Sequence, residues 1–310
     1  MAVHTSINRS EIKNILNSYD IGSLKVFEGI SEGIENTNYF LETTNNKFIL
    51  TIFEKRVKKK DLPFYLKLMS HVKKEGLNCP VSVENLEKNK LSKLKNKFFS
   101  IFTFIEGKCL TNWNEKTCYQ VGKKLAEFHL INFSFKCEKM NDYGINNWNS
   151  IYNQISSKMD LYLPGLEKKI FRELNFLQKN WPKSLPTGII HADLFPDNVL
   201  FKENKISGII DFYFSCSDFL IYDLSISINA WCFKNKTIQP KLLKSFIDGY
   251  ESKRKITNRE KKKFNIFLRG AAIRFLLTRL YDFFKEKNDL KKKNPLDFIE
   301  ILNFHKNNTI

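Results

Sequence analysis

One stretch of this chain combines apolar, strand-like runs with polar residues at a fixed spacing. Residues 189–200 begin and end with apolar residues and carry His191, Asp193 and Asn198 between them. A second apolar run ends in Asp211, eighteen residues after Asp193. A polar hairpin turn with an ordinary acid nearby would explain a lone His-x-Asp. Three acidic or amide groups at this spacing, each beside an apolar run, favour chemistry on a phosphoryl group instead.

The spacing has a mechanical meaning in protein-kinase-like folds. There the first aspartate accepts the proton of the hydroxyl that is phosphorylated, and the asparagine and the later aspartate bind the metal. We therefore expect Asp193 as the catalytic acceptor. Asn198 and Asp211 are the expected ligands of Mg²⁺, an ion that prefers hard oxygen donors. Asp197 is more typical of a turn, and His191 is expected to hydrogen-bond the loop backbone rather than to shuttle protons.

Composition and charge exclude several classes of protein. The 310 residues suit two modest domains or one bilobal unit, and 42% hydrophobic residues can fill a sizeable core. The apolar runs are too short to cross a membrane, the N-terminus lacks a signal-peptide pattern, and the six cysteines lack metal-ligand spacing. We therefore expect a cytoplasmic chain without a membrane partner.

The net charge of +18 raises the question of nucleic-acid binding. A nucleic-acid binder gathers its basic residues on one face, with aromatic residues between them. Here the lysines are spread along the chain, and the two basic runs, 55–60 and 291–293, are more typical of solvated loops or tails. We expect no nucleic-acid partner, although the charge would attract an anionic nucleotide.

The pattern along the chain predicts two halves of different character. The N-terminal third is rich in strand-like segments, which are 38–43, 47–53, 79–84 and 97–105. It also contains two expected helices, one that begins at a capping box at Asn8 and one over 62–74. The rest is mainly helical, with expected helices at 115–128, 150–179, 241–250 and 259–284. We predict an α+β, bilobal, protein-kinase-like fold, with a nucleotide-binding N-lobe (1–105) and a C-lobe (106–310) that carries the catalytic loop and the substrate pocket.

Several phrases, spread over both lobes, carry a resemblance to known proteins; they are 31–41, 191–201, 210–214, 229–233 and 269–276. Through them the chain resembles the aminoglycoside phosphotransferase and choline kinase superfamily, and more narrowly its bacterial homoserine kinases. The resemblance implies an enzyme that uses ATP and Mg²⁺ to phosphorylate the small molecule L-homoserine for threonine synthesis. Kinases of choline, aminoglycosides or a thioribose are the alternatives, together with a catalytically silent ATP-binding module.

The resemblance also implies residues that bind the nucleotide and support the loop. The segment 33–39 takes the place of a glycine-rich phosphate loop. Gly33, with the backbone N–H groups of Asn36 and Thr37, is expected to face the phosphates. Asp223 corresponds to a structural aspartate that braces the catalytic loop, and a plain helix cap is the compatible alternative.

One expected ion pair is absent from the sequence. Thr51 stands where kinase-like folds carry a strand lysine, and the helix over 62–74 contains no acid to pair with it. Because both partners are missing together, no buried charge is left alone. Another cation must then meet the phosphates, and the candidates are Lys47, Lys55 and Arg56.

A zwitterionic substrate needs a cation for its carboxylate and an acceptor for its ammonium group. Arg269 and Arg274 lie in an otherwise apolar helix, where a buried arginine normally has an acidic partner. Either could bind the substrate carboxylate, or could form a salt bridge to Asp218 or Asp223. The other expected pocket residues are Tyr213, Asp218 and Asn229.

Overall fold

The computed structural model describes residues 4–30, 36–54, 57–285 and 294–308, and it divides into two compact units. Unit one comprises Met1–Lys108, Leu200–Lys202 and Ser207–Tyr213, and unit two comprises Cys109–Val199, Glu203–Ile206 and Phe214–Ile310. The predicted α+β composition, a small antiparallel sheet followed by a mostly helical remainder, is confirmed.

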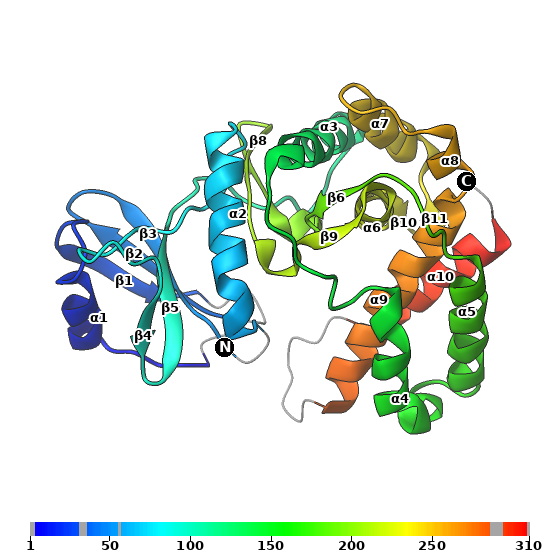
Figure 1. The fold of residues 1–310 in the computed structure, drawn as a ribbon, viewed down its shortest axis with the longest axis horizontal. Coiled ribbons are helices and arrows are strands. Elements are labelled where there is room, and N and C mark those ends of the chain that lie inside the picture. The colour runs from blue at the N-terminus through cyan, green and yellow to red at the C-terminus, as the bar shows by residue number, and fades with distance from the viewer. Residues whose placement is uncertain (1–3, 31–35, 55–56, 286–293, 309–310) are drawn as a thin grey trace. The chain divides into compact units, whose positions relative to one another are not determined.

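Unit one is built on a five-stranded antiparallel sheet (Figure 1). In the order β1-β2-β3-β5-β4 its strands are β1 (Leu24–Gly29), β2 (Thr37–Thr43), β3 (Lys47–Ile52), β5 (Lys97–Thr103) and β4 (Ser92–Leu94). Buried and half-buried residues alternate along β2, as the two-residue period of a strand requires. Tyr39 and Leu41 on its buried face share a core with Ile12 and Leu16 of α1 (Arg9–Leu16).

The predicted helix starts of unit one are present. Helix α1 begins at the capping box, in which Asn8 Oδ1 accepts from Glu11 N and the Glu11 carboxylate accepts from Asn8 N. Helix α2 (Leu62–Lys74) has Pro63 in its first turn. Gly76 follows α2 with φ of +91°, a conformation that lets the chain leave the helix without Cβ strain.

One predicted strand does not form. Within the described chain, residues 79–84 contribute an isolated bridge from Ser82 to Phe102 in place of a strand. Pro80 removes a backbone donor from this segment, and that loss is unfavourable inside a sheet. The sequence pattern also does not predict the two strands β1 and β4.

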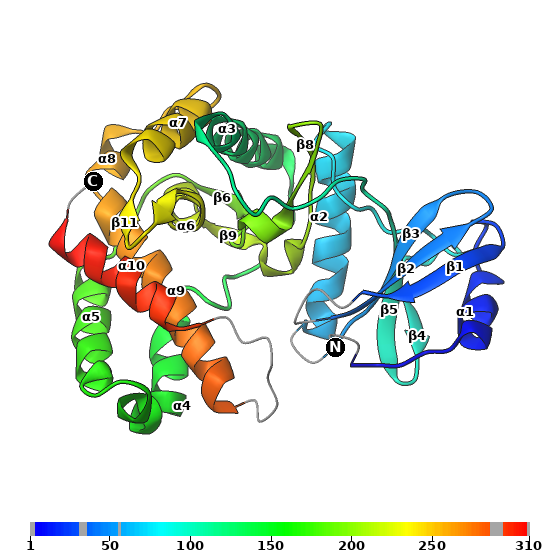
Figure 2. The same cartoon turned by 180° about the vertical axis from the view of Figure 1, so that it is seen from behind.

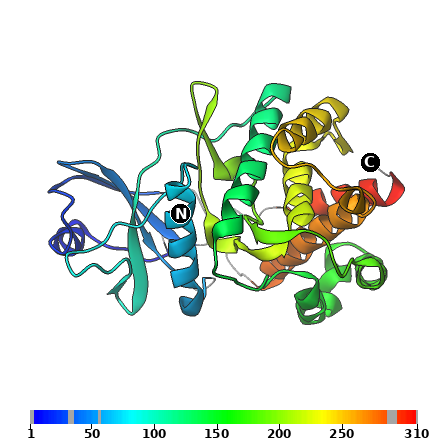
Figure 3. The ribbon, with the colours of Figure 1, turned by 45° about the horizontal axis from the view of Figure 1, so that its top comes forward.

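Unit two is mainly helical. Its helices are α3 (Glu115–Ile131), α4 (Ile145–Tyr162), α5 (Leu166–Asn180), α6 (Leu220–Cys232), α7 (Pro240–Glu251), α8 (Asn258–Lys261), α9 (Phe264–Lys285) and α10 (Leu296–Asn307). Helix α6, yellow in Figure 3, is buried almost all round and packs against α3, α7 and α9. In the described part of the chain, no helix is long and apolar enough to span a membrane.

Short strands and turns complete the structure. The paired strands are β6 (Thr187–Ile190) with β9 (Cys216–Phe219), β7 (Val199–Lys202) with β8 (Lys205–Ile209), and β10 (Phe233–Lys234) with β11 (Thr237–Ile238). The 3₁₀ turns are η1 (Lys59–Asp61), η2 (Asn132–Ser134), η3 (Pro196–Asn198) and η4 (Phe212–Phe214).

Helices α3 and α7 lie side by side in both Figure 1 and Figure 2, and a glycine on each permits the close approach. A Cβ atom added to Gly122 or to Gly249 would stand 2.1 Å from a backbone oxygen of the opposite helix. Any side chain at either position would therefore force the helices apart. This packing matters because α3 carries His129 and α7 carries Tyr250, which support the catalytic loop.

Two predicted helices of unit two are each divided. The segment 150–179 belongs to α4 and α5, because Pro164 and Gly165 interrupt it and Gly165 has φ of +75°. The segment 259–284 belongs to α8 and α9. The pattern does not predict α6 or α10. Helix α6 is apolar on every side, so it lacks the amphipathic period that reveals a surface helix.

The predicted domain division at residues 105–106 misses two later segments of unit one. Lys108 and Phe201 exchange both backbone hydrogen bonds at 2.9 Å, and Ile209 N donates to Asn78 O at 3.0 Å. These bonds attach the two segments to the N-terminal unit. Such pairings between distant parts of a chain leave no local pattern in the sequence.

Candidate active site

The predicted catalytic loop of unit two follows β6 and ends in η3. At its start, Ala192 is fully buried and has φ of +64°. An L-residue in this left-handed region costs of order 1–3 kcal/mol and persists only where its surroundings over-determine it. The bonds that hold this loop are therefore part of the site.

Asp223, fully buried in the first turn of α6, supplies two of these bonds. Its Oδ2 accepts from His191 N and its Oδ1 accepts from Ala192 N, both at 2.8 Å. His129 Nε2 also donates to Asp223 Oδ2 at 3.0 Å. Burial alone would raise the pKa of Asp223, but the hydrogen bond and charge of His129 and the His191 N–H hold that pKa below its usual value of 3.8. The loop thus rests on an ionised, buried carboxylate.

The support continues through α3, α7 and α8. His129 Nδ1 is hydrogen-bonded to the Tyr250 hydroxyl at 2.8 Å. Arg254 donates to the same hydroxyl at 3.1 Å and to Glu260 Oε1 at 2.8 Å. Because these groups are almost wholly buried, loss of any one leaves a polar partner without compensation.

Two loop carbonyls are held from other helices. Trp231 of α6 donates from Nε1 to Leu194 O at 2.8 Å. Arg274 of α9, only 2% exposed, donates from Nη1 to Ala192 O. The sequence suggests neither contact, since nothing in the local pattern distinguishes these residues from ordinary core.

The two polar side chains of the loop are oriented by each other. Asn198 Nδ2 donates to Asp193 O at 2.7 Å and to Asp193 Oδ2 at 3.0 Å. Because the amide nitrogen is used in this way, Asn198 Oδ1 remains an oxygen ligand for a cation. Asp193 N donates to His191 Nδ1 at 3.3 Å, so the histidine contacts the backbone of the loop.

Asp211 belongs to unit one, where it follows β8 with φ of +63° and a half-buried side chain. The Asp211 carboxylate in unit one and the Asn198 amide oxygen in unit two are each, taken singly, a hard ligand of the kind that Mg²⁺ or Ca²⁺ accepts beside water and phosphate oxygens. Among the described residues, no group of three or more His, Cys, Asp or Glu forms a self-sufficient metal site. By its chemistry, each of these two oxygen donors therefore suits a divalent ion that takes most of its ligands from other molecules.

The predicted nucleotide contacts lie in unit one. Gly33 falls outside the described residues, and Lys47 is exposed at the start of β3. Asn36 Oδ1 accepts from Glu54 N at 3.2 Å, and Thr37 Oγ1 donates to Glu54 Oε1 at 2.8 Å. Because these two side chains are used internally, a phosphate contact would have to come from their backbone N–H groups.

Two predicted substrate residues join helices instead. Arg269 donates through Nε and Nη2 to the buried carboxylate of Glu173, at 2.7 and 2.8 Å, so its partner is neither Asp218 nor Asp223. Asn229, which is 3% exposed, uses both ends of its amide. Its Nδ2 donates to Leu268 O at 2.9 Å, and its Oδ1 is hydrogen-bonded to His305 Nε2 at 2.7 Å.

For Arg274, the predicted salt bridge to Asp218 or Asp223 is replaced by a hydrogen bond to a backbone carbonyl, Ala192 O. Asp218 is half-buried and accepts from Asn141 Nδ2 at 2.7 Å. Burial raises the pKa of Asp218, although the Asn141 hydrogen bond and the charge of Arg274 oppose this. Asp218 thus remains available as an acceptor at the edge of this helical core.

We expect an Arg269→Met variant to lose about 3 kcal/mol of unfolding free energy, because it leaves the buried Glu173 carboxylate without its bidentate partner. The KM for the phosphoryl acceptor should change less than about twofold. Urea unfolding and steady-state kinetics measure both quantities. Arg172→Met, an exposed arginine one residue before Glu173, is the matched control. If KM for the acceptor rose while the unfolding free energy stayed unchanged, the prediction that Arg269 binds substrate would be correct after all.

Arg279, further along α9, is a candidate that the sequence analysis misses. Its guanidinium lies over the Phe298 ring at 4.4 Å, and Nη1 donates to Asp297 Oδ2 at 2.7 Å. Phe298 contacts Phe195, two residues after Asp193, with ring centroids 6.4 Å apart. Burial lowers the pKa of Arg279, while the charges of Asp297 and Asp193 oppose this. Its one sequence signal is the five-residue spacing of the arginines on α9.

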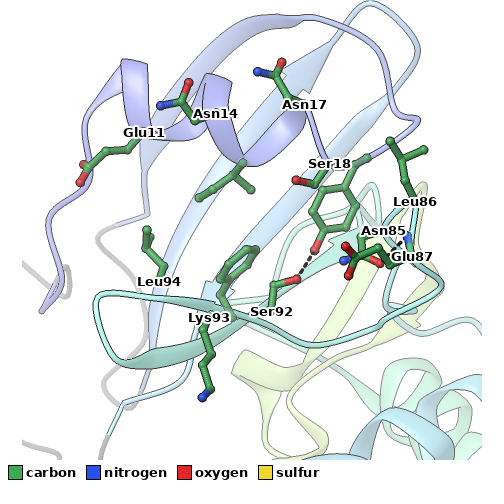
Figure 4. A pocket seen from close by; sticks show the side chains of 13 residues that line it. Glu11, Asn14, Asn17, Ser18, Asn85, Leu86, Glu87, Ser92, Lys93 and Leu94 are labelled. Carbon is green, nitrogen blue, oxygen red and sulfur yellow. Dashed lines mark hydrogen bonds between the residues drawn. The ribbon is translucent and has the colours of Figure 1, made fainter.

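Unit one also contains a hollow of about 540 Å³ between α1 and residues 85–94 (Figure 4). Glu11, Asn14, Ser92 and Lys93 are among the residues that line it. It contains none of the predicted site residues, and we assign it no part in the chemistry.

Comparison with known proteins supports the kinase-like interpretation. Residues 26–261 match the phosphotransferase enzyme family. A homoserine kinase of Agrobacterium fabrum is 41% identical over 309 residues, which cover 99% of this chain and 96% of the relative. A homoserine kinase of Allorhizobium ampelinum is 44% identical over 308 residues, which cover 98% and 96%.

Among solved structures, an amicoumacin kinase in complex with AMP-PNP and Ca²⁺ is similar, with a TM-score of 0.72. The match covers 97% of this chain and 92% of that one, at 14% sequence identity. At this identity the likeness establishes the fold, and it confirms the predicted protein-kinase-like class.

Proposed function

The chain belongs to the phosphotransferase enzyme family, and from this membership we propose that it transfers the γ-phosphoryl group of ATP to the hydroxyl of L-homoserine. The choice of homoserine as the phosphoryl acceptor is supported by the sequence identity of 41–44%, over nearly the full length, to homoserine kinases. Choline, aminoglycosides and a thioribose are not favoured, because the similarity to homoserine kinases is at 41–44% identity, whereas the similarity to the amicoumacin kinase is at 14%. Asp193 and Asn198, whose side chains are hydrogen-bonded to each other, are the residues that phosphoryl transfer requires, and their presence argues against a silent nucleotide-binding module.

Each residue of the loop then has a defined role. Asp193 orients the homoserine hydroxyl and accepts its proton as the phosphoryl group is transferred. Asp223 and His129 keep the strained loop in place. The Asp193 carboxylate is therefore already positioned and does not have to reorient during the reaction. His191 supports the loop backbone.

Asn198 and Asp211 each offer an oxygen to Mg²⁺, which when bound neutralises phosphate charge. For the nucleotide we propose the backbone N–H groups of Asn36 and Thr37, with Gly33 and the Lys47 ammonium as further contacts. Mg²⁺ is chosen over Ca²⁺ as the usual partner of nucleotide phosphates.

The substrate is a zwitterion, and unit two offers a group for each of its charges. We assign Arg279 to the carboxylate, because its Nε and Nη2 groups make no hydrogen bond within the described residues. Asp218 is assigned to the ammonium group. Arg274 stabilises this region through Ala192 O rather than by contact with substrate.

An ADP-release assay with Mg²⁺ and ATP tests this proposal on homoserine, choline, a thioribose, an aminoglycoside and 3-aminopropan-1-ol. The last compound is homoserine without its carboxylate. We expect kcat/KM for homoserine to exceed that for 3-aminopropan-1-ol by roughly 10- to 100-fold, the usual value of a hydrogen bond to a charged group. Efficient turnover of another alcohol, with none on homoserine, would contradict the proposed acceptor.

The same assay separates Arg279 from a general electrostatic effect. Arg279→Met should lower kcat/KM for homoserine to the level of 3-aminopropan-1-ol, and should leave the smaller substrate within about threefold. Lys285→Met, an exposed cation at the end of α9, is the control. An equal loss on both substrates would remove Arg279 from the carboxylate role.

We also propose that the enzyme works in the cytoplasm, where ATP is available. Consistent with a reducing compartment, all six cysteines are present as thiols.

A further inference from the structure

The place of the missing strand lysine is occupied by a hydrogen-bonded threonine. Thr51 of β3 is 4% exposed, and its Oγ1 donates to Asn38 Oδ1 at 2.8 Å. Lys55 and Arg56, the alternative cations, fall outside the described residues. The buried position is therefore satisfied by a neutral group on the neighbouring strand. An acid follows three residues later, at Glu54, and it is the centre of a different set of contacts.

The Glu54 carboxylate lies just after β3 and accepts hydrogen bonds from distant parts of unit one. Only 9% of the side chain is exposed. Its Oε1 accepts from Thr5 Oγ1 at 2.6 Å and from Thr37 Oγ1 at 2.8 Å. Its Oε2 forms an ion pair with the ammonium group of Lys97, the first residue of the neighbouring strand β5 (Figure 1). Burial alone would raise the pKa of Glu54, but these hydrogen bonds hold that pKa below its usual value of 4.5, so the carboxylate is ionised.

Thr37, the first residue of β2, is fully buried and uses its hydroxyl both as donor and as acceptor. Besides donating to Glu54, Thr37 Oγ1 accepts from the backbone N–H groups of His4 and Thr5 at 2.9 and 3.1 Å. The residue before it, Asn36, accepts through Oδ1 from Glu54 N at 3.2 Å. The carboxylate and the backbone N–H of Glu54 thus hold the two adjacent residues Asn36 and Thr37.

The chain just before Glu54 is itself held in the sheet. Phe53 N donates to Phe98 O of β5 at 2.9 Å. The Phe53 ring packs edge-on against Tyr213, with centroids 5.5 Å apart, and Tyr213 packs in the same way against Tyr65 at 5.6 Å. Tyr213, predicted to line the substrate pocket, thus lies against aromatic residues of unit one. Glu54 therefore projects from a well-packed part of this unit.

We propose that Glu54 is a positioning residue for the nucleotide, which holds Asn36 and Thr37 in place on the sheet of unit one. The inference rests on the proposed function, in which the backbone N–H groups of these two residues face the phosphates. Backbone donors bind an anion tightly only if their direction is set before it arrives, because ordering them on binding costs free energy. The ion pair with Lys97 keeps the Glu54 carboxylate charged, and a charged acceptor makes the stronger hydrogen bonds.

Calorimetry with two ligands tests this role: AMP-PNP, which carries the phosphates, and adenosine, which lacks them. Glu54→Gln keeps the size of the side chain, but it turns one oxygen into an NH₂ group that would face a donor. We expect AMP-PNP, with Mg²⁺ present, to bind about 5- to 20-fold more weakly, as the loss of a hydrogen bond to a charged group would cause. The affinity for adenosine should change less than about twofold.

Substitutions of Thr37 test the same contact from the other side. Thr37→Val keeps the shape of the side chain and removes the hydroxyl, so it should cause a similar loss for AMP-PNP alone. Thr37→Ser retains the hydroxyl and should bind AMP-PNP within about twofold of the native protein. The double variant Glu54→Gln, Thr37→Val should lose less than the product of the two single losses, because both remove the same contact. If Glu54→Gln does not fold, Thr37→Val decides the question, since it leaves the ion pair with Lys97 in place.

A matched control is Glu84→Gln, which removes another carboxylate from unit one. Glu84 pairs with Lys90 at 3.9 Å, and both side chains are well exposed. An ion pair of this kind contributes little, so the variant should bind AMP-PNP and adenosine as the native protein does.

Two results would overturn the inference: unchanged AMP-PNP binding in Glu54→Gln and Thr37→Val, or an equal loss for AMP-PNP and adenosine. The second result would mean that the substitutions disturb unit one as a whole. The readout does not involve the acceptor alcohol. A chain that fails to phosphorylate homoserine, yet shows the phosphate-selective loss in Glu54→Gln, would refute the proposed acceptor and support this inference.

Discussion

An Asp193→Asn variant should lose about three orders of magnitude in kcat while its melting temperature stays within a few degrees of the native value, because general acid–base groups contribute roughly 10²- to 10⁴-fold. Asparagine can still accept the Asn198 Nδ2 hydrogen bond through its own Oδ1. The change therefore removes the charge and the proton acceptor, and it retains the geometry of the loop. Steady-state kinetics and thermal unfolding measure the two effects separately.

The control for this result lies on the same loop. Asp197→Asn removes an exposed carboxylate one residue before Asn198, and kcat should fall less than about fivefold. Near-normal turnover in Asp193→Asn would take the acceptor role away from this residue. A comparable loss in Asp197→Asn would show that the net charge of the loop, rather than one placed carboxylate, is responsible.

The second large effect is expected for Asp223→Asn, with a loss of roughly 3–5 kcal/mol in unfolding free energy at pH 7. Both carboxylate oxygens of Asp223 accept from backbone N–H groups, those of His191 and Ala192. In asparagine one oxygen becomes an NH₂ group, which would face another donor. The loop should then relax from the left-handed conformation at Ala192, and kcat should fall with the stability.

The pH dependence of stability gives an independent measurement of the same group. The pKa of Asp223 is lower in the folded protein than its usual value of 3.8. Its contribution is therefore complete above about pH 4 and is lost as the pH falls through the folded pKa. The native unfolding free energy should decline more steeply below pH 4 than that of Asp223→Asn.

Asp248→Asn on α7 is the matched surface control, since its pair with Lys244 is largely exposed. It should cost less than about 1 kcal/mol. If Asp223→Asn were no more harmful than this control, or if the acid limbs of the two curves were parallel, Asp223 would be an ordinary helix cap.

The sequence predicts best where a pattern is local. The capping box at Asn8, the end of α2 near Gly76 and the alternation along β2 follow from the preferences of a few neighbouring residues. The break at Gly165 also has a local signal, a Pro-Gly pair, although the periodicity around it predicts one long helix. Helix α6 has no such signal, because a helix that is buried on every side shows no polar face.

The site shows the same division between local and distant information. A buried arginine is predictable as needing a partner, but the pattern cannot choose between Glu173 and a substrate for Arg269. The hydrogen bonds from Asp223 through His129 to Tyr250 join α6 and α7 to α3, whose His129 lies 94 residues before Asp223 in the sequence. Pairings of this kind arise from packing, and a single sequence carries no record of them.

What the sequence alone determined about this protein is the reaction class, because the spacing of Asp193, Asn198 and Asp211 is local and chemically demanding. Family resemblance added the acceptor. Only the tertiary structure decided which polar residues hold the catalytic loop in place and which remain available to bind substrate. Arg269 and Asn229 join helices, while Arg279 lies within the electrostatic influence of Asp193. The physical reason is that each polar side chain can make only a few hydrogen bonds. Which neighbours accept or donate those bonds depends on distances that are set only when the helices pack together.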